Sequence, residues 1–121
     1  MVKVLGIGGF FFRAKDPTGL AEWYQTHLGI DPAPTSSTMK PWTTKEGVTI
    51  FPPFDQGTDY FPDGHTFMLN FRVESLDAAL KELAEAGIEG GEVANMDGVG
   101  LFARIHDPEG NPIELWEVPN G

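Results

Sequence analysis

The sequence predicts an α+β fold made of two similar halves, each with a strand, a helix and then two or three further strands. A strand-like segment, a capped helix and a glycine that ends the helix follow one another from residue 9, and the same order recurs from residue 65. Two copies indicate a duplicated supersecondary unit, because a solenoid needs about three or more. The residues that carry each element are considered in chain order.

The first half begins with a short aromatic strand. Residues 9–14 (GFFFRA) are mostly apolar and too few for a helix, which favours a buried strand. Asp16 is placed to cap the next helix, and Pro17 is tolerated at its first position. Apolar side chains recur at helical spacing over residues 18–28, and Gly29 is typical of the position just past a helix end.

The second half repeats this order with clearer alternation. Residues 65–73 alternate between apolar side chains on one face and mostly polar ones on the other, as a strand does. Ser75 can cap a helix over residues 76–86, and Gly87 ends it. Short strands are predicted to complete both halves, at residues 38–43, 47–51, 92–96, 101–106 and 113–118.

A tight turn fixes the register of the last two strands. Residues 107–111 (DPEGN) have an early Pro and a Gly-Asn pair that accepts positive φ. A loop of these residues pairs Ile105 with Ile113, Arg104 with Glu114, Ala103 with Leu115 and Phe102 with Trp116. Glu114 then lies beside Arg104 and among aromatic side chains. It is either half of a structural ion pair, worth about 0.2 to 1 kcal/mol, or a ligand-facing carboxylate.

Composition excludes several classes of function. The chain has 121 residues, no Cys and a formal net charge of -10, and we expect one domain over residues 1–121, with modules at about 1–58 and 63–121. The lack of a thiol excludes thiolate nucleophiles and thiolate metal sites. The acidic excess repels a phosphate backbone, and no long apolar run is present. We therefore expect a cytoplasmic protein with no nucleic-acid or membrane partner.

Two motifs resemble a known superfamily. The stretch DPEGNPIELWE at residues 107–117 and the pattern WYxxxLG at residues 23–29 are similar to those of the vicinal oxygen chelate superfamily, which includes glyoxalase I, bleomycin-resistance proteins and extradiol dioxygenases. The resemblance covers essentially the whole chain. It implies two βαβββ modules that pair into an incomplete barrel around a cavity, and a homodimer.

Metal-binding members of that superfamily use four strand positions as ligands, and the resemblance matches only one of them here. Glu114 stands where the Glu of the last strand ligates. The other positions fall at Gly9, Ile50 and Met68; the first two cannot ligate, and a thioether suits these divalent ions poorly. His65 falls on the opposite strand face from Met68. The resemblance therefore implies neither a metal site nor another cofactor.

The candidate site is the inner face that the resemblance assigns to the cavity. Aromatic side chains there would stack on a ligand while Glu114 and Asn70 orient it, and an acidic surface would attract a cation. The predicted cavity residues are Phe11, Arg13, Met68, Asn70, Phe102, Arg104 and Trp116. Loop aromatics that mark either a binding rim or a dimer contact are Trp42, Phe54, Tyr60 and Phe61.

These residues support functions of different classes. The preferred hypothesis is a protein that binds a small aromatic or cationic molecule without a metal, as the bleomycin-resistance branch does. The alternative is a divalent-metal-dependent lyase, isomerase or dioxygenase with Glu114 as a ligand. A metal-free enzyme would use Glu114 as a general base, although Arg104 would lower its pKa and weaken it. A purely structural or interaction role would account for the exposed aromatics.

Overall fold

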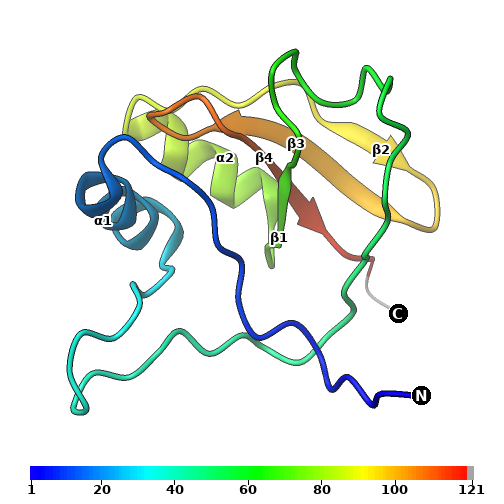
Figure 1. Ribbon diagram of the computed structural model, residues 1–121. Helices are drawn as coiled ribbons and strands as arrows, with labels where there is room; N and C mark the ends of the chain where they lie inside the picture. The colour runs from blue at the N-terminus through cyan, green and yellow to red at the C-terminus, as the bar shows by residue number, and fades with distance from the viewer. Residues whose placement is uncertain (120–121) are drawn as a thin grey trace.

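The computed structural model describes residues 1–119, in which two helices accompany a four-stranded sheet (Figure 1). The helices are α1 (Pro17–Leu28) and α2 (Leu76–Glu85). The strands are β1 (Leu69–Arg72), β2 (Ala94–Met96), β3 (Gly100–His106) and β4 (Pro112–Glu117). Their order is β1-β4-β3-β2, with β1 parallel to β4 and the other neighbours antiparallel. The predicted α+β class is confirmed.

Both helices begin at the predicted cap residues. The Asp16 carboxylate accepts the backbone N–H of Gly19 at 3.0 Å. The Ser75 hydroxyl accepts the N–H of Ala78 at 3.2 Å. Gly29 ends α1 in the left-handed conformation, with φ at 68°, which a side chain would disfavour. Local capping chemistry therefore sets where each helix starts and where α1 stops.

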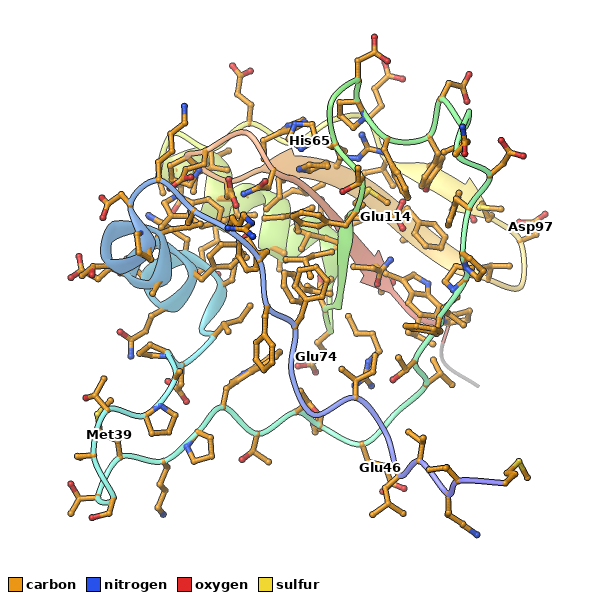
Figure 2. All side chains as sticks on the ribbon, in the orientation of Figure 1. Met39, Glu46, His65, Glu74, Asp97 and Glu114 are labelled. Atoms are coloured by element: carbon orange, nitrogen blue, oxygen red, sulfur yellow. The ribbon has the colours of Figure 1, made fainter. Side chains whose placement is uncertain are left out.

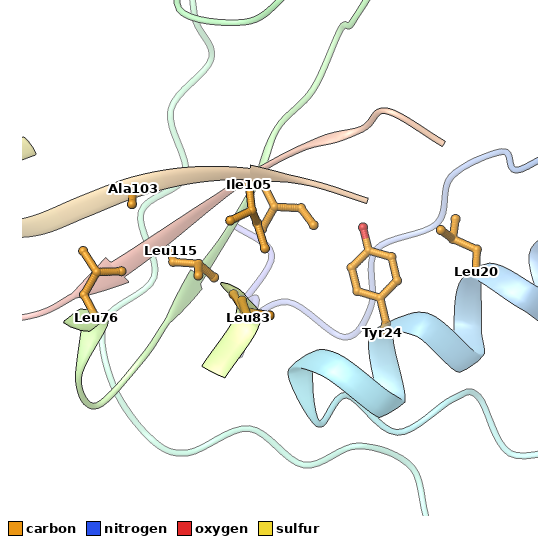
Figure 3. Close-up of a cluster of buried hydrophobic side chains, with 8 residues drawn as sticks. Leu20, Tyr24, Leu76, Leu83, Ala103, Ile105 and Leu115 are labelled. Carbon is orange, nitrogen blue, oxygen red and sulfur yellow. The ribbon is translucent and has the colours of Figure 1, made fainter. Parts of the chain in front are cut away.

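One face of the sheet forms the hydrophobic core with the two helices. Figure 3 shows side chains of α1, α2, β3 and β4 gathered in one cluster. Because strand side chains alternate, the core takes every second residue of β3 and β4 and leaves the others on the opposite face. The buried core residues are Leu20, Tyr24, Leu76, Leu83, Ala103, Ile105, Ile113 and Leu115.

The predicted register of the last hairpin is confirmed. Ile105 pairs with Ile113, Arg104 with Glu114, Ala103 with Leu115 and Phe102 with Trp116. The Asp107 carboxylate holds the turn, because it accepts the backbone N–H groups of Glu109 at 2.9 Å and Asn111 at 3.0 Å. Turn chemistry and strand alternation agree here, so the local sequence determines the structure.

The first half forms its helix but not its predicted strands. In the described structure residues 9–14, 38–43 and 47–51 have no strand, and the sheet is open and not closed into a barrel. A strand persists only when a neighbouring backbone accepts and donates its hydrogen bonds. Among the described residues, no backbone hydrogen bond joins these three segments to the sheet. Residues 30–60 instead run as a long irregular arc outside the sheet (Figure 1). The predicted strand at 65–73 is shorter, Leu69–Arg72.

Many apolar side chains of the first half therefore meet solvent. Leu5 and Phe11 are each 95% exposed, and Phe51 is 85% exposed. Phe12 is attached through its ring, whose centre lies 5.8 Å from that of Phe67 and 6.4 Å from that of Tyr24. Within residues 1–119 no helix has the length and apolar character needed to cross a membrane.

Candidate functional site

The sheet face opposite the helices carries two rows of side chains. Pairing of β1 with β4 and of β4 with β3 aligns them across three strands. The first row is polar and the second is largely aromatic. The first consists of Asn70, Glu114 and Arg104, and the second of Arg72, Trp116 and Phe102.

Glu114 is the centre of the polar row. Its side chain is only 8% exposed, and a buried carboxylate requires hydrogen-bond donors to offset its lost hydration. Asn70 Nδ2 donates to Oε1 at 2.7 Å, and the Tyr60 hydroxyl donates to Oε2. In Figure 2, Glu114 lies near the middle of the molecule, whereas Met39 lies on the irregular arc. Both carboxylate oxygens thus have a protein donor.

Arg104 does not form an ion pair with Glu114, which was one of the two roles open to that carboxylate. The two residues face each other across β3 and β4, yet in the part of the chain that the structure describes the salt bridge found is Lys81–Asp77 on α2. Arg104 Nη2 instead donates to the Tyr60 carbonyl oxygen at 2.8 Å. Its guanidinium carbon lies 5.5 Å from the centre of the Tyr60 ring, which is a cation–π distance. Tyr60 therefore contacts both charged groups, Glu114 through its hydroxyl and Arg104 through its carbonyl oxygen and ring.

Two stacked aromatic pairs adjoin this polar row. The rings of Phe102 and Trp116 are nearly parallel, with centres 5.7 Å apart and planes inclined by 6°. Trp116 Nε1 donates to the Val99 carbonyl oxygen at 2.9 Å, which fixes the indole. Phe54 stacks on Tyr60 with centres 5.6 Å apart. A flat apolar surface therefore lies next to a buried acceptor.

The environment keeps Tyr60 protonated. Burial raises its pKa most, and the hydrogen bond to Glu114 and the negative charge of that carboxylate raise it further, to about 12. The positive charge of Arg104 acts in the opposite direction. The phenol is therefore a neutral donor to an anionic acceptor, which makes a charge-assisted hydrogen bond.

The family follows from the match of most of the chain. Residues 9–116 match the family model of the glyoxalase-like domain. The chain belongs to this family. No curated protein matches it.

Three solved structures are similar to this chain, and the first two show the same fold. TnmS3, an antibiotic binding protein from Streptomyces sp. CB03234, is 22% identical with a TM-score of 0.68, over 98% of this chain and 100% of that one. A structure described as a conserved domain protein is 13% identical with a TM-score of 0.55, over 88% and 92% of the two chains. A glyoxalase / bleomycin resistance protein from Catenulispora acidiphila DSM 44928 is 27% identical with a TM-score of 0.49, over 86% and 90%.

The glyoxalase-like domain brings together only part of the predicted site. Asn70, Phe102, Arg104, Glu114 and Trp116 share the sheet face, and Met68 lies half-buried just before β1. Phe11 and Arg13 are exposed on the N-terminal segment, and no hydrogen bond or ring contact described joins them to this face. Their predicted placement depended on a strand over residues 9–14, which is not formed.

Sequence reasoning missed the role of Tyr60. It was predicted to lie in a loop, as a rim residue or a dimer contact, and the structure places its hydroxyl on Glu114. The available signal was its membership of a cluster of loop aromatics with Phe54 and Phe61. Nothing in the local pattern identified the carboxylate as its partner, because 54 positions separate the two residues.

The side chains around Glu114 do not fit a divalent metal ion. Within residues 1–119 no group of three or more His, Cys, Asp or Glu residues is arranged to hold one. Both Glu114 oxygens already accept hydrogen bonds, and the facing residue in the sheet is the cation Arg104. Zinc sites in proteins use three or four N, O or S side-chain ligands, and the described residues of this face do not offer such a set.

Two surface pockets of the glyoxalase-like domain lie away from Glu114. One, of about 160 Å³, is lined by both helices and the core side of the sheet, and includes His27 and Glu82. The other, of about 450 Å³, lies by the last turn and includes Trp23 and His106. Neither is lined by Glu114, over which Tyr60 lies.

Proposed function

We propose that this glyoxalase-like domain binds a small aromatic or cationic molecule on the sheet face that carries Glu114, without a metal ion. The observation that carries the proposal is the buried Glu114 carboxylate beside the stacked rings of Phe102 and Trp116. Ligand sites combine apolar and aromatic surface with a few placed polar groups. A carboxylate fixes the orientation of a donor or a cation, and the flat rings supply stacking area.

The likeness to TnmS3 supports binding without naming a ligand. That protein is an antibiotic binding protein, and its fold covers 98% of this chain. Because one fold hosts many functions, the support for this chain comes from its own face and not from the likeness. A role in sequestering a small molecule agrees with both observations.

We propose binding without a metal ion because the residues at the superfamily's ligand positions are poor metal ligands. Three of the four superfamily ligand positions fall at Gly9, Ile50 and Met68, and Glu114 is engaged by Tyr60 and Asn70. A metal-dependent lyase, isomerase or dioxygenase would need ligands that these positions do not offer. The predicted cytoplasmic location stays a prediction.

The first experiment separates these functions. The protein is stripped with EDTA, and its thermal unfolding is measured with Ni, Zn, Co, Mn or Fe(II) added in turn. We expect no shift in Tm, whereas an ion present at a hundredfold excess over its Kd would add about 2.7 kcal/mol and raise Tm by several degrees. A shift that disappears in Glu114→Ala would overturn the metal-free proposal and lead to lyase and dioxygenase assays.

The second experiment tests binding itself. Ethidium, a planar aromatic cation, is titrated into the wild-type protein, Glu114→Gln and Glu85→Gln. Glu85 is an exposed residue of α2, so its variant changes net charge equally without touching the face. We expect Glu114→Gln alone to weaken binding, by about tenfold, since it removes a charged partner worth about 1.5 kcal/mol. Equal binding by all three proteins would exclude a cation held by Glu114 and leave an aromatic ligand as the remaining form of the proposal.

We also propose that two copies of the chain associate. The support is the exposed apolar first half, in which Leu5, Phe11 and Phe51 are at least 85% exposed and residues 9–14 have no neighbouring strand among residues 1–119. Large exposed apolar patches commonly mark protein contacts. Light scattering after gel filtration should give twice the 13.2 kDa of the chain, and Phe11→Ser should give one copy. A wild-type mass of one copy would contradict the dimer.

A further inference from the structure

One residue makes the hydrogen bonds that join the segment of residues 52–64 to the sheet. The segment's own hydrogen bonds are local: Thr58 N–H donates to the Asp55 carbonyl oxygen, and Tyr60 N–H donates to the Thr58 hydroxyl. Within residues 1–119, every hydrogen bond described between this segment and the sheet involves Tyr60. The Tyr60 hydroxyl donates to Glu114, and its carbonyl oxygen accepts from Arg104.

Tyr60 is bound as a ligand would be bound. Its hydroxyl donates a hydrogen bond to the buried carboxylate of Glu114. The centre of its ring lies 5.5 Å from the guanidinium carbon of Arg104, and Phe54 stacks on the ring. Tyr60 remains 43% exposed and Phe54 44% exposed, and neither ring belongs to the hydrophobic core, so displacing this pair leaves the core in place. Another phenol can reproduce the hydroxyl contact with Glu114 and the ring contact with Arg104, whereas the hydrogen bond from Arg104 to the Tyr60 carbonyl oxygen has no counterpart in a phenol.

We propose that Tyr60 is a built-in occupant of the ligand site, and that the ligand is a planar aromatic phenol that displaces Tyr60 from Glu114 and Arg104. This inference rests on the proposed binding function and narrows it to one ligand class. It also names the segment that moves, residues 52–64.

Charge favours a phenol over a cation at this position. A cation held by Glu114 in place of the Tyr60 hydroxyl would lie beside the Arg104 guanidinium, which repels it. A neutral phenol is compatible with both groups, because its hydroxyl donates to the carboxylate and the face of its ring attracts the guanidinium. Removal of Tyr60 without such a ligand would leave Glu114 with Asn70 as its remaining described donor.

Competition by Tyr60 should lower the apparent affinity. A tethered group competes at a high effective concentration, and a ligand binds only the fraction of molecules whose site is open. Tyr60→Phe keeps the ring but removes the hydroxyl that holds it on Glu114. The phenylalanine therefore leaves the site more readily, and more molecules are open to the ligand.

The test uses 2-naphthol and, as its matched probe without a donor, 2-methoxynaphthalene. By calorimetry, we expect wild type to prefer 2-naphthol and Tyr60→Phe to bind it about tenfold more tightly, the equivalent of one hydrogen bond. If Tyr60 were instead part of the wall that holds the ligand, Tyr60→Phe would bind 2-naphthol equally or more weakly. Either result would overturn the inference, as would failure of 2-naphthol to bind either protein.

A second measurement uses the wild-type chain alone, so it does not depend on how the variant folds. On addition of 2-naphthol, amide hydrogen exchange over residues 54–61 should become faster, because the segment is released. Slower exchange there would show a ligand that seats against Tyr60, contrary to displacement. Glu114-dependent binding of ethidium together with no binding of 2-naphthol would overturn this inference and leave the proposed binding function intact.

Discussion

The raised pKa of the Tyr60 hydroxyl makes the stability of the fold depend on pH. Its pKa is raised from an ordinary value near 10 to about 12, first by burial and then by Glu114. A group whose pKa is higher in the folded state stabilises that state below its ordinary pKa and loses this contribution as pH rises through the folded value. We therefore expect stability to fall from about pH 10 to 12, more in wild type than in Tyr60→Phe.

The measurement is an ultraviolet titration of the phenolate. The wild-type curve minus that of Tyr60→Phe gives the Tyr60 transition, since the other tyrosine is Tyr24. Glu114→Gln should lower the pKa of Tyr60, because the hydrogen bond to the carboxylate and its negative charge both raise it. An unchanged transition in that variant would contradict the contact.

Asp107 is a buried carboxylate that accepts several hydrogen bonds and contributes to the stability of the fold. It is only 5% exposed, and its Oδ2 accepts from the Tyr24 hydroxyl at 2.7 Å and from Asn111 Nδ2 at 2.8 Å. Tyr24→Phe should lower the free energy of unfolding by about 1 to 2 kcal/mol, since a buried carboxylate loses one donor. Urea denaturation measures this, with Glu85→Gln as the control. No loss of stability would show that the bond contributes little.

At this scale the sequence predicted the members of the polar row but not how they pair. Asn70 and Glu114 followed from strand alternation and the turn at residues 107–111. Their alignment across parallel strands, and the insertion of Tyr60 between Arg104 and Glu114, depend on contacts far apart in the chain. Patterns of local period contain no information about such contacts.

Among the elements, the β3–β4 hairpin requires glycine at its first residue. Gly100 has φ at 133°, and an added Cβ would lie 2.3 Å from the Glu117 carbonyl oxygen and 2.6 Å from Trp116 Nε1. Gly100→Ala should therefore destabilise the fold by more than about 1 kcal/mol and disturb the stacked indole. Thermal unfolding and tryptophan fluorescence measure both effects.

The matched control is Gly8→Ala, because nothing lies within 4 Å of a Cβ built there. It should leave Tm nearly unchanged. Equal losses of stability in the two variants would show that the close approach at Gly100 is unimportant.

The predicted elements that form are those whose sequence signals lie within a few residues of their ends. The helices and the last hairpin have caps and a turn within a few residues of their ends, and they form as predicted. The strands predicted at 9–14, 38–43 and 47–51 had apolar character but no signal for a partner, and they are absent from the described structure. An apolar run indicates an extended backbone, while only a neighbouring strand makes it part of a sheet.

At the scale of the whole molecule, Glu109 joins the two halves. Its carboxylate, in the turn between β3 and β4, accepts the backbone N–H groups of Lys15 at 2.7 Å and Asp16 at 3.0 Å. Glu109→Ala should speed amide exchange in α1 while α2 is unaffected, and should lower the free energy of unfolding by about 1 to 2 kcal/mol. Equal acceleration in both helices would show general destabilisation instead of a lost connection.

This connection also sets an order of events during synthesis. Lys15 and Asp16 leave the ribosome long before Glu109, which lies 94 and 93 positions later. Closing so long a loop is slow compared with forming a helical turn, so α1 can be helical early but unattached. The nascent chain then carries its exposed aromatic N-terminal segment until the last hairpin has emerged. Helix α1 is thus made well before the contact with Glu109 that fixes its position can form.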